Sequence, residues 1–397
     1  MPSSDRQPAT IAARCGIDSD SQFGAVVPPV HLSSTFSFES LGCKRNHDYS
    51  RSGNPTRDLL AEALTELEGG AAATVMATGM GAITTVLQLL KPDDVLLAPL
   101  DCYGGTFRLM SALASRGAFR LRWTDFSDST RWPADLDDSV RMIWLETPSN
   151  PLLRITDIRA VTEAARVRET LVVADNTFLS PALQNPIALG ADLVVHSTTK
   201  YINGHSDVVG GAVIAADSDL GEQIAWWANC IGVTGSAWDS WLTLRGLRTL
   251  DVRIQRAQET TAELAELLCA HPAVDCVHFP GLDSHSGHAV ARRQQRGFGA
   301  MLSFELRGGL EAVEAFVDGL GLMTLAESLG GVESLVAHPA TMTHAAMAPE
   351  DQARAGITPG LLRLSVGLED VRDLSAELSQ ALDRAQRGLR TVRAVSN

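Results

Sequence analysis

Residues 192–207 read DLVVHSTTKYINGHSD, a short apolar run followed by hydroxyl-bearing residues and a single lysine. The apolar run predicts a buried strand, so Lys200 is expected just beyond the carboxyl end of that strand. Open α/β sheets bind their ligands at this end. We therefore predict that Lys200 reacts with a bound ligand, and that the hydroxyls of Ser197 and Thr199 bond a phosphate on it.

Apolar runs of the same kind recur along the middle of the chain. They lie at residues 94–100, 141–146, 171–176 and 211–216. Residues 157–169 carry apolar side chains at helical spacing, and residues 61–90 are predicted as two helical stretches joined at Gly69 and Gly70. Fully apolar strands separated by helices indicate a mostly parallel sheet covered on both faces, so the expected fold class is α/β.

The composition and residue pattern of the chain change twice, which predicts three structural parts. Residues 1–62 are rich in Pro, Ser and Gly and predict an extended arm that contributes to a neighbouring active site. Residues 63–256 hold the apolar strands and predict the ligand-binding domain. Residues 257–397 predict a smaller α+β domain, with a strand at 300–306 and a final helix at 371–386.

Lysine is scarce in this chain. Of 33 basic residues only Lys44, Lys91 and Lys200 are lysines. Arginine stays protonated and is a poor amine nucleophile, whereas lysine can lose its proton and form an imine. Lys44 and Lys91 lie in polar segments typical of solvated charges. Lys200 is therefore the predicted Schiff-base lysine.

A carboxylate is expected near this lysine. Asp175 ends the apolar run LVVAD, so it also lies at the carboxyl end of a predicted strand. A carboxylate there can keep a pyridine nitrogen protonated, which makes the ring a strong electron sink. An imine-forming lysine combined with such a carboxylate predicts pyridoxal 5'-phosphate (PLP) as the cofactor. Tyr103 follows the run at 94–100, and its aromatic ring is predicted to stack on the flat cofactor.

Two further segments predict phosphate contacts. Gly79 and Met80 open a helix, where backbone N–H groups and the helix dipole favour an anion. Tyr49 and Arg51 lie on one side of an extended segment of the arm and predict a phosphate clamp. Because the arm has no core of its own, this clamp is predicted to serve a neighbouring subunit.

Several function classes are excluded by composition. The net charge of −14 argues against a nucleic-acid surface. No apolar run approaches about 18 residues, so no membrane span is expected, and the polar N-terminus lacks the core of a signal peptide. The six scattered cysteines predict reduced thiols in the cytoplasm. The histidines lack metal-ligand spacing, so no metal site is predicted.

Several sequence blocks together carry a family resemblance. They are YSRSGNPT (49–56), TGMGAI (78–83), DCYGGT (101–106), ETPSNP (146–151), VADNTF (173–178), HSTTKYINGHSD (196–207), LAESLGGVESL (325–335) and LRLSVGLED (362–370). In this order the chain resembles the Cys/Met-metabolism family of PLP-dependent enzymes from about residue 9 to residue 385. The resemblance implies a PLP-dependent type I aminotransferase-like fold and a homotetramer built from two catalytic dimers.

The resemblance also implies residue roles. Lys200 would hold the cofactor and shuttle protons, and Tyr103 would take part in proton transfer. The residues implied to bind an amino-acid substrate are Arg363, which would clamp the α-carboxylate, Ser328 and Asn150, which would assist it, and Glu327 and Arg108, which would face the distal end.

Blocks such as VVPPVHLSSTF (26–36) and WWANCIGVTG (226–235) resemble the bacterial γ-replacing branch of the family, which makes cystathionine from O-succinylhomoserine and cysteine. Ser52 departs from that branch, because its enteric members carry a second arginine there, and the block LSVGLED (364–370) also reads like the γ-eliminating branch. O-acetylhomoserine as substrate, γ-elimination, sulfide as the thiol, and a non-catalytic PLP-binding protein therefore stay open.

Overall fold

The computed structural model describes residues 6–395, with side chains from residue 6 to residue 387. The chain forms two compact units. Among the described residues, unit 1 comprises residues 6–96, 138–144 and 158–252, and unit 2 comprises residues 97–137, 145–157 and 253–395. The start of the predicted arm (1–5) and the end of the predicted C-terminal domain (396–397) lie outside the described residues. The predicted boundaries after residues 62 and 256 stay predictions.

A seven-stranded sheet forms the centre of the α/β fold. Its strands are β1 (Ala72–Met76), β2 (Val95–Pro99), β3 (Arg120–Thr124), β4 (Val140–Glu146), β5 (Leu171–Asp175), β6 (Leu193–His196) and β7 (Gly211–Ala215), in the spatial order β1-β7-β6-β5-β4-β2-β3. Strands β5 and β6 pair in parallel, with Asp175 opposite Val195. The predicted mostly parallel sheet is confirmed.

Two details of this sheet differ from the prediction. β7 pairs antiparallel with both β6 and β1. The loop between β6 and β7 contains no helix, and a chain that returns without a crossover must run antiparallel. Residues 61–90 do hold two helices, α2 (Pro55–Glu68) and α3 (Gly79–Leu87), but the prediction that they join directly at Gly69 and Gly70 was wrong, because β1 lies between them. Five residues of an edge strand are too few to show a clear period.

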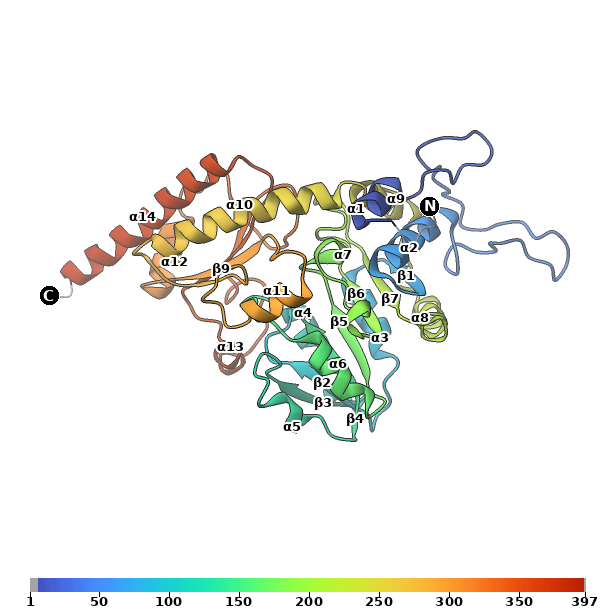
Figure 1. Ribbon diagram of the computed structural model, residues 1–397, viewed down its shortest axis with the longest axis horizontal. Coiled ribbons are helices and arrows are strands. Elements are labelled where there is room, and N and C mark those ends of the chain that lie inside the picture. The colour runs from blue at the N-terminus through green and yellow to red at the C-terminus, as the bar shows by residue number, and fades with distance from the viewer. Residues whose placement is uncertain (1–5, 396–397) are drawn as a thin grey trace. The chain divides into compact units, whose positions relative to one another are not determined.

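Helices cover the sheet, and within unit 1 they are α1 (Pro8–Arg14), α2, α3, α6 (Ile158–Arg166), α7 (Ser180–Leu183), α8 (Ser218–Ile231) and α9 (Ala237–Leu247). α3 packs with α8 and on β7, while α2 packs with α9 and on β1. α2 begins within the last residues of the predicted arm, where the side chain of Asn54 accepts hydrogen bonds from the backbone N–H groups of Thr56 and Arg57. Between α1 and α2, the arm forms the long blue loops of Figure 1.

Unit 2 has its own five-stranded sheet. The strands are β8 (Val274–His278), β9 (Met301–Leu306), β10 (Thr324–Leu325), β11 (Leu335–Ala337) and β12 (Leu361–Ser365), in the order β10-β11-β12-β9-β8. The helices α11 (His288–Gln294), α12 (Gly309–Val317), α13 (Pro349–Ala355) and α14 (Val371–Val395) belong to the same unit, while α10 (Leu250–Ala270) begins in unit 1 and continues into unit 2. Unit 2 also includes α4 (Gly104–Ser115) and α5 (Trp132–Asp135), which pack on β3 of the seven-stranded sheet. The predicted strand at 300–306 and the predicted final helix are confirmed.

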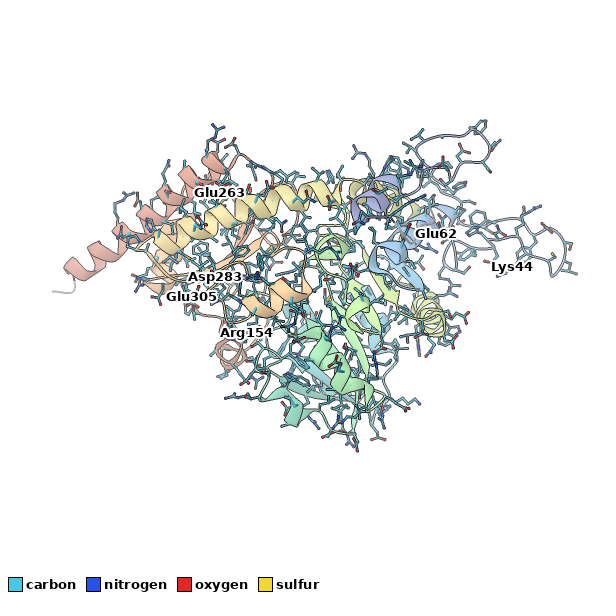
Figure 2. The ribbon with its side chains drawn as sticks, in the orientation of Figure 1. Lys44, Glu62, Arg154, Glu263, Asp283 and Glu305 are labelled. Carbon is cyan, nitrogen blue, oxygen red and sulfur yellow. The ribbon has the colours of Figure 1, made fainter. Side chains whose placement is uncertain are left out.

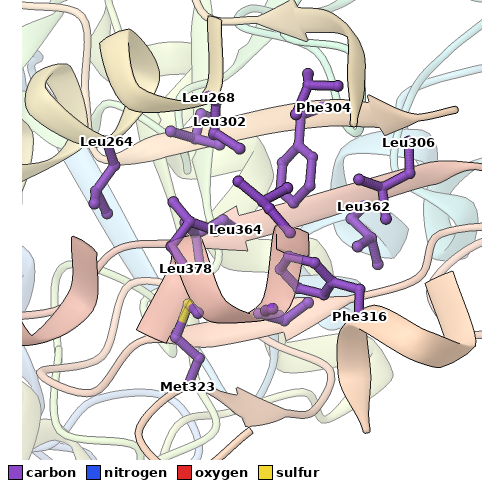
Figure 3. Close-up of a cluster of buried hydrophobic side chains, with 14 of the residues drawn as sticks. Leu264, Leu268, Leu302, Phe304, Leu306, Phe316, Met323, Leu362, Leu364 and Leu378 are labelled. Carbon is purple, nitrogen blue, oxygen red and sulfur yellow. The ribbon is translucent and has the colours of Figure 1, made fainter. Parts of the chain in front are cut away.

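The core of unit 2 lies between this sheet and its helices. Phe304 from β9 and Phe316 from α12 are fully buried, with ring centres 5.5 Å apart. Leu362 and Leu364 from β12 and Leu378 from α14 join the same cluster (Figure 3). This core fixes β12, the strand that carries Arg363. Over residues 6–395 no helix is both long and apolar enough to cross a membrane.

Candidate active site

The predicted cofactor lysine follows β6 at its carboxyl end, as expected. Lys200 donates its backbone N–H to the carbonyl of Ser197 at 3.2 Å, and Gly204 donates its N–H to the Lys200 carbonyl at 2.8 Å. These turns hold the lysine in a tight loop between β6 and β7, with its side chain half-buried. By contrast, Lys44 lies on the arm with most of its side chain exposed (Figure 2).

Asp175 is the last residue of β5, next to the strand that leads to the lysine. The Thr177 backbone N–H donates to the Asp175 carboxylate at 3.0 Å, and the Thr177 hydroxyl oxygen accepts the Ser197 N–H at 2.9 Å. Thr177 thus ties the two strand ends together. Burial raises the pKa of the Asp175 carboxyl, while the Thr177 hydrogen bonds and nearby His196 lower it. A carboxylate in this setting suits a protonated ring nitrogen.

The start of α3 lies against the same loop. The Thr78 hydroxyl oxygen accepts the Gly81 N–H at 2.7 Å, and Gly79 and Met80 begin the helix ahead of its hydrogen-bond ladder. A Cβ added at Gly79 would lie 2.8 Å from the Ser197 Cβ, so only glycine permits this close approach. Backbone donors beside a serine suit a phosphate, and these residues therefore fit the PLP phosphate.

Thr199 has an additional partner that the sequence did not indicate. Its hydroxyl accepts the Gly210 N–H at 2.9 Å and lies 3.2 Å from the Gly210 carbonyl, to which it donates. A hydroxyl has one proton and two lone pairs, so it can keep the Gly210 N–H and turn its proton to a phosphate oxygen. The predicted phosphate contact of Thr199 is compatible with this geometry and stays a prediction.

The arm presents Tyr49 and Arg51 together. The Arg51 guanidinium lies 5.8 Å from the centre of the Tyr49 ring, and Tyr49 is 49% exposed. Asp48 braces this turn, because its carboxylate accepts the Tyr49 N–H at 2.7 Å and the Ser52 hydroxyl at 2.8 Å. The Ser52 hydroxyl is therefore part of the turn that presents the predicted phosphate clamp.

A buried pair beneath the lysine loop was missed by sequence reasoning. His196 Nε2 lies 2.6 Å from Glu68 Oε1, and both side chains are fully buried. Asn176 donates to the same Glu68 oxygen at 2.9 Å and to the Gln184 carbonyl at 2.8 Å. The network fixes the residues that directly follow Asp175 and directly precede Ser197. Its members lie far apart in the sequence, so no local pattern reveals it.

Unit 2 holds the predicted carboxylate clamp. Arg363, in the middle of β12, is only 2% exposed. Its Nη1 donates to Asn150 Oδ1 at 2.9 Å, and its Nη2 donates to the Ser328 carbonyl at 2.9 Å. The structure thus brings together three of the predicted substrate residues. Both acceptors are neutral oxygens, so these bonds orient the guanidinium without cancelling its positive charge.

Two side chains accompany this clamp. His344 Nε2 lies 3.1 Å from the Asn150 carbonyl, and its Nδ1 lies 2.9 Å from the Thr343 hydroxyl. Burial lowers the pKa of His344 to about 4, and the charge of Arg363 acts in the same direction. A neutral His344 therefore supports Asn150 without repelling Arg363. Ser328 has a positive φ of 88°, a strained conformation that its carbonyl bond to Arg363 helps to hold.

Tyr103 directly precedes α4 and is 39% exposed, and its backbone N–H donates to Glu146 at 2.9 Å. Arg108 on α4 and Glu327 beside Ser328 are exposed, and their roles toward the distal end of a substrate stay predictions. In the part of the chain that the structure describes, no group of three or more His, Cys, Asp or Glu side chains could hold a metal.

Residues 9–383 match the family model of the Cys/Met metabolism PLP-dependent enzymes. The chain belongs to this family. It is 55% identical over 384 residues to a cystathionine γ-synthase of Escherichia coli (strain K12), a match that covers 96% of this chain and all of that protein. PLP is accordingly the cofactor of this enzyme, and the binding roles of Lys200 and Asp175 stay predictions.

Solved structures agree with this membership. A cystathionine γ-synthase from Xanthomonas oryzae pv. oryzae, crystallised with cystathionine, has a TM-score of 0.95 and 60% identity, covering 96% of this chain and 99% of that one. A cystathionine γ-lyase from Lactobacillus plantarum, complexed with L-serine, reaches a TM-score of 0.93 at 40% identity over 96% of this chain and 100% of that one. The shared fold thus serves both γ-replacement and γ-elimination.

Because the pKa of Asp175 is raised, we predict that this carboxyl lowers the stability of the folded apoprotein while it favours cofactor binding. In the unfolded chain this carboxyl loses its proton at a lower pH than in the folded apoprotein, so the folded apoprotein loses stability as pH rises through that window. We expect Asp175→Asn to raise the melting temperature of the apoprotein at neutral pH, to show no gain below pH about 4, and to weaken PLP binding. Calorimetry and PLP titration would check this, and an unchanged or lower neutral-pH melting temperature would contradict it.

Proposed function

We propose that this enzyme catalyses γ-replacement, in which O-succinyl-L-homoserine and L-cysteine give L-cystathionine and succinate. The observation that carries the proposal is the full-length similarity to the Xanthomonas synthase, whose structures hold cystathionine or aminoacrylate with cysteine. The γ-lyases among the relatives share less of the sequence, at 40–42% identity. The reaction is a step of transsulfuration toward methionine.

The residues around β5 and β6 handle the proton transfers. Lys200 would hold the cofactor, and its Nζ, when free, would take the proton from the substrate Cα. When bound, PLP supplies an electron sink that stabilises negative charge at that carbon. Asp175 would keep the ring nitrogen protonated, while Ser197, Thr199, Gly79 and Met80 would hold the phosphate.

Unit 2 supplies the groups for the amino-acid substrate. Arg363 binds the α-carboxylate through its planar guanidinium, with Asn150 and Ser328 holding that plane in one orientation. Tyr103 is assigned to stack on the cofactor ring and to assist proton transfer, and Arg108 and Glu327 to face the ester end. The C–O bond at Cγ breaks as succinate leaves, and the cysteine sulfur forms the new C–S bond there after losing its proton.

One observation favours γ-elimination as a second candidate. Ser52 stands where enteric synthases carry arginine, so Arg51 is not directly followed by a second cation for a succinyl carboxylate. The structure gives Ser52 a different use, because its hydroxyl braces the turn through Asp48. Cystathionine γ-lyase activity, a sulfhydrylase using sulfide, and O-acetylhomoserine as the ester are the outcomes that an assay must separate.

The test compares two esters with and without cysteine. Purified holoenzyme is incubated with O-succinyl- or O-acetylhomoserine, and cystathionine and α-ketobutyrate are quantified by mass spectrometry. Cystathionine as the main product of the succinyl ester with cysteine is the expected result. Cystathionine breakdown with no turnover of either ester would replace the proposal with the lyase activity. Adding sulfide in place of cysteine tests for sulfhydrylase activity. If no reaction of any kind occurred, the chain would be a non-catalytic PLP-binding protein.

We also propose that the enzyme works as a cytoplasmic homotetramer of two catalytic dimers, with each arm completing a neighbouring site. The arm supports this, since Phe23 is 81% exposed and Leu32 is 73% exposed, an unusual surface for a lone chain. Trp226 and Trp238 add exposed apolar area in the same unit. The cysteines form no disulfide among the described residues, which suits a reducing compartment.

This arrangement predicts the effect of removing Arg51. If its guanidinium binds the phosphate of a neighbouring site, Arg51→Ala should weaken PLP retention about tenfold or more, because charged hydrogen bonds to an anion are lost. PLP content after dialysis measures this. Arg45→Ala, which removes another exposed arginine of the arm, is the control. Equal retention by the two variants would refute the clamp.

A further inference from the structure

Glu146, the last residue of β4, is buried, with 5% of its surface exposed. Its two carboxylate oxygens accept hydrogen bonds from two different segments. Oε2 accepts the backbone N–H of Tyr103 at 2.9 Å, and Oε1 accepts the backbone N–H of Asn150 at 3.1 Å. One carboxylate therefore bridges the turn before α4 and the loop after β4.

Both bridged segments carry residues of the candidate site. Tyr103 leads into α4, and the Asn150 side-chain oxygen accepts a hydrogen bond from the Arg363 guanidinium at 2.9 Å. His344 reaches the Asn150 carbonyl at 3.1 Å, so Asn150 is held through its N–H, its carbonyl and its side chain. Hydrogen bonds to an ionised acceptor are about twice as strong as neutral ones. Moving Glu146 would therefore shift Tyr103 and the Arg363 clamp together.

We propose that Glu146 is a positioning residue that sets the place of Tyr103 relative to the Asn150–Arg363 clamp. The inference rests on the proposed function, because that function gives Tyr103 and Arg363 their roles. Glu146 itself is assigned no contact with substrate. Its effect on the reaction passes through two backbone N–H groups on opposite sides of one carboxylate.

A second link joins the same two segments and supplies the competing explanation. The Ser149 hydroxyl donates to the carboxylate of Asp101, two residues before Tyr103. Arg154 lies 3.5 Å from the same Asp101 carboxylate (Arg154 is labelled in Figure 2). If this link alone fixed the segments, loss of the Glu146 charge would leave Tyr103 and Asn150 in place.

The experiment compares Glu146→Gln with Glu305→Gln in the holoenzyme. Glutamine keeps the size of Glu146 and one acceptor oxygen, but it turns an NH₂ group toward one of the two N–H groups. Glu305 is a matched control, because it is a half-buried carboxylate of unit 2 that bonds His278 and Thr358 instead (Figure 2). Steady-state kinetics and amide hydrogen exchange by mass spectrometry are the two readouts.

We expect Glu146→Gln to lower kcat/KM about 10- to 100-fold, with kcat falling through Tyr103 and KM rising through the clamp. Glu146→Asp, which keeps the charge, should recover part of this loss. Exchange should rise about tenfold in peptides covering 101–107 and 147–154 and stay unchanged over 361–365. A Tyr103→Phe/Glu146→Gln double-mutant cycle should be non-additive.

Normal kinetics with unchanged exchange in both peptides would overturn the proposal in favour of the Asp101–Ser149 link. A uniform rise in exchange with additive mutant effects would also overturn it, because that pattern marks a loss of global stability. If the parent enzyme made no cystathionine, the proposed function would fail, yet the exchange data would still decide whether Glu146 holds both segments.

Discussion

Lys200→Ala should abolish turnover, lowering kcat by at least about 10³-fold. The variant loses both the amine that attaches the cofactor and the base that moves the Cα proton, and a positioned acid–base group alone contributes about 10²- to 10⁴-fold. The phosphate contacts of Ser197, Gly79 and Met80 remain, so the variant should still retain PLP. Product formation, and PLP content after gel filtration, measure the two effects separately.

Two controls sharpen this prediction. Lys200→Arg keeps the positive charge but cannot attach the cofactor, so it should fail equally. Lys44→Ala removes an exposed lysine of the arm and should leave turnover within twofold of the parent. Borohydride reduction of the parent should fix the cofactor on the peptide that contains Lys200. Retention of more than a tenth of the parental turnover by Lys200→Ala would refute the assignment.

Arg363→Lys is expected to have the second largest effect, lowering kcat/KM for the homoserine ester about 100-fold or more, mainly through KM. Lysine keeps the charge but presents one ammonium in place of a planar fork, so it cannot bond a carboxylate in two places and also bond Asn150 and the Ser328 carbonyl. Kinetics with the ester as the varied substrate measure the loss.

A substrate analogue makes this test specific. The α-carboxamide of the ester lacks the anion that Arg363 binds, so parent and Arg363→Lys should turn it over at similarly low rates. Arg307→Lys is a matched control, because Arg307 is an exposed arginine of the same unit that pairs with Asp275. An unchanged KM in Arg363→Lys, or an equal loss on the carboxamide, would contradict the clamp.

The sequence predicted the cofactor residues because they obey a local rule. Asp175 and Lys200 stand where a fully apolar run changes to polar residues, and such changes mark the carboxyl ends of buried strands. Glu146 obeys the same rule at the end of β4, so the pattern that indicated Asp175 could have found it. The pattern does not predict the hydrogen-bond partners of Glu146, because nothing in the local sequence shows that its carboxylate bonds two backbone N–H groups.

Other features depend on contacts between distant parts of the chain. The Glu68–His196 pair joins α2 to β6 across 128 residues, and although His196 begins the block HSTTKYINGHSD, nothing in that block indicates Glu68 as its partner. Strand β1 was missed because only its last two residues are buried, which leaves no period to read. The Arg363 clamp came from family resemblance, and the structure supplied its hydrogen bonds and the neutral His344 beside it.

The placement of the three lysines has a practical consequence for surface coupling. Lys44 and Lys91 are exposed, whereas Lys200 is half-buried in its loop and would be masked by the cofactor. Amine-reactive dyes or resins should therefore attach at two lysine side chains in the described chain, those of Lys44 and Lys91. Replacing either of them by arginine would leave a single reactive lysine side chain. Because Lys44 lies on the arm, a fluorophore coupled there would report directly on whether the arm docks against another copy.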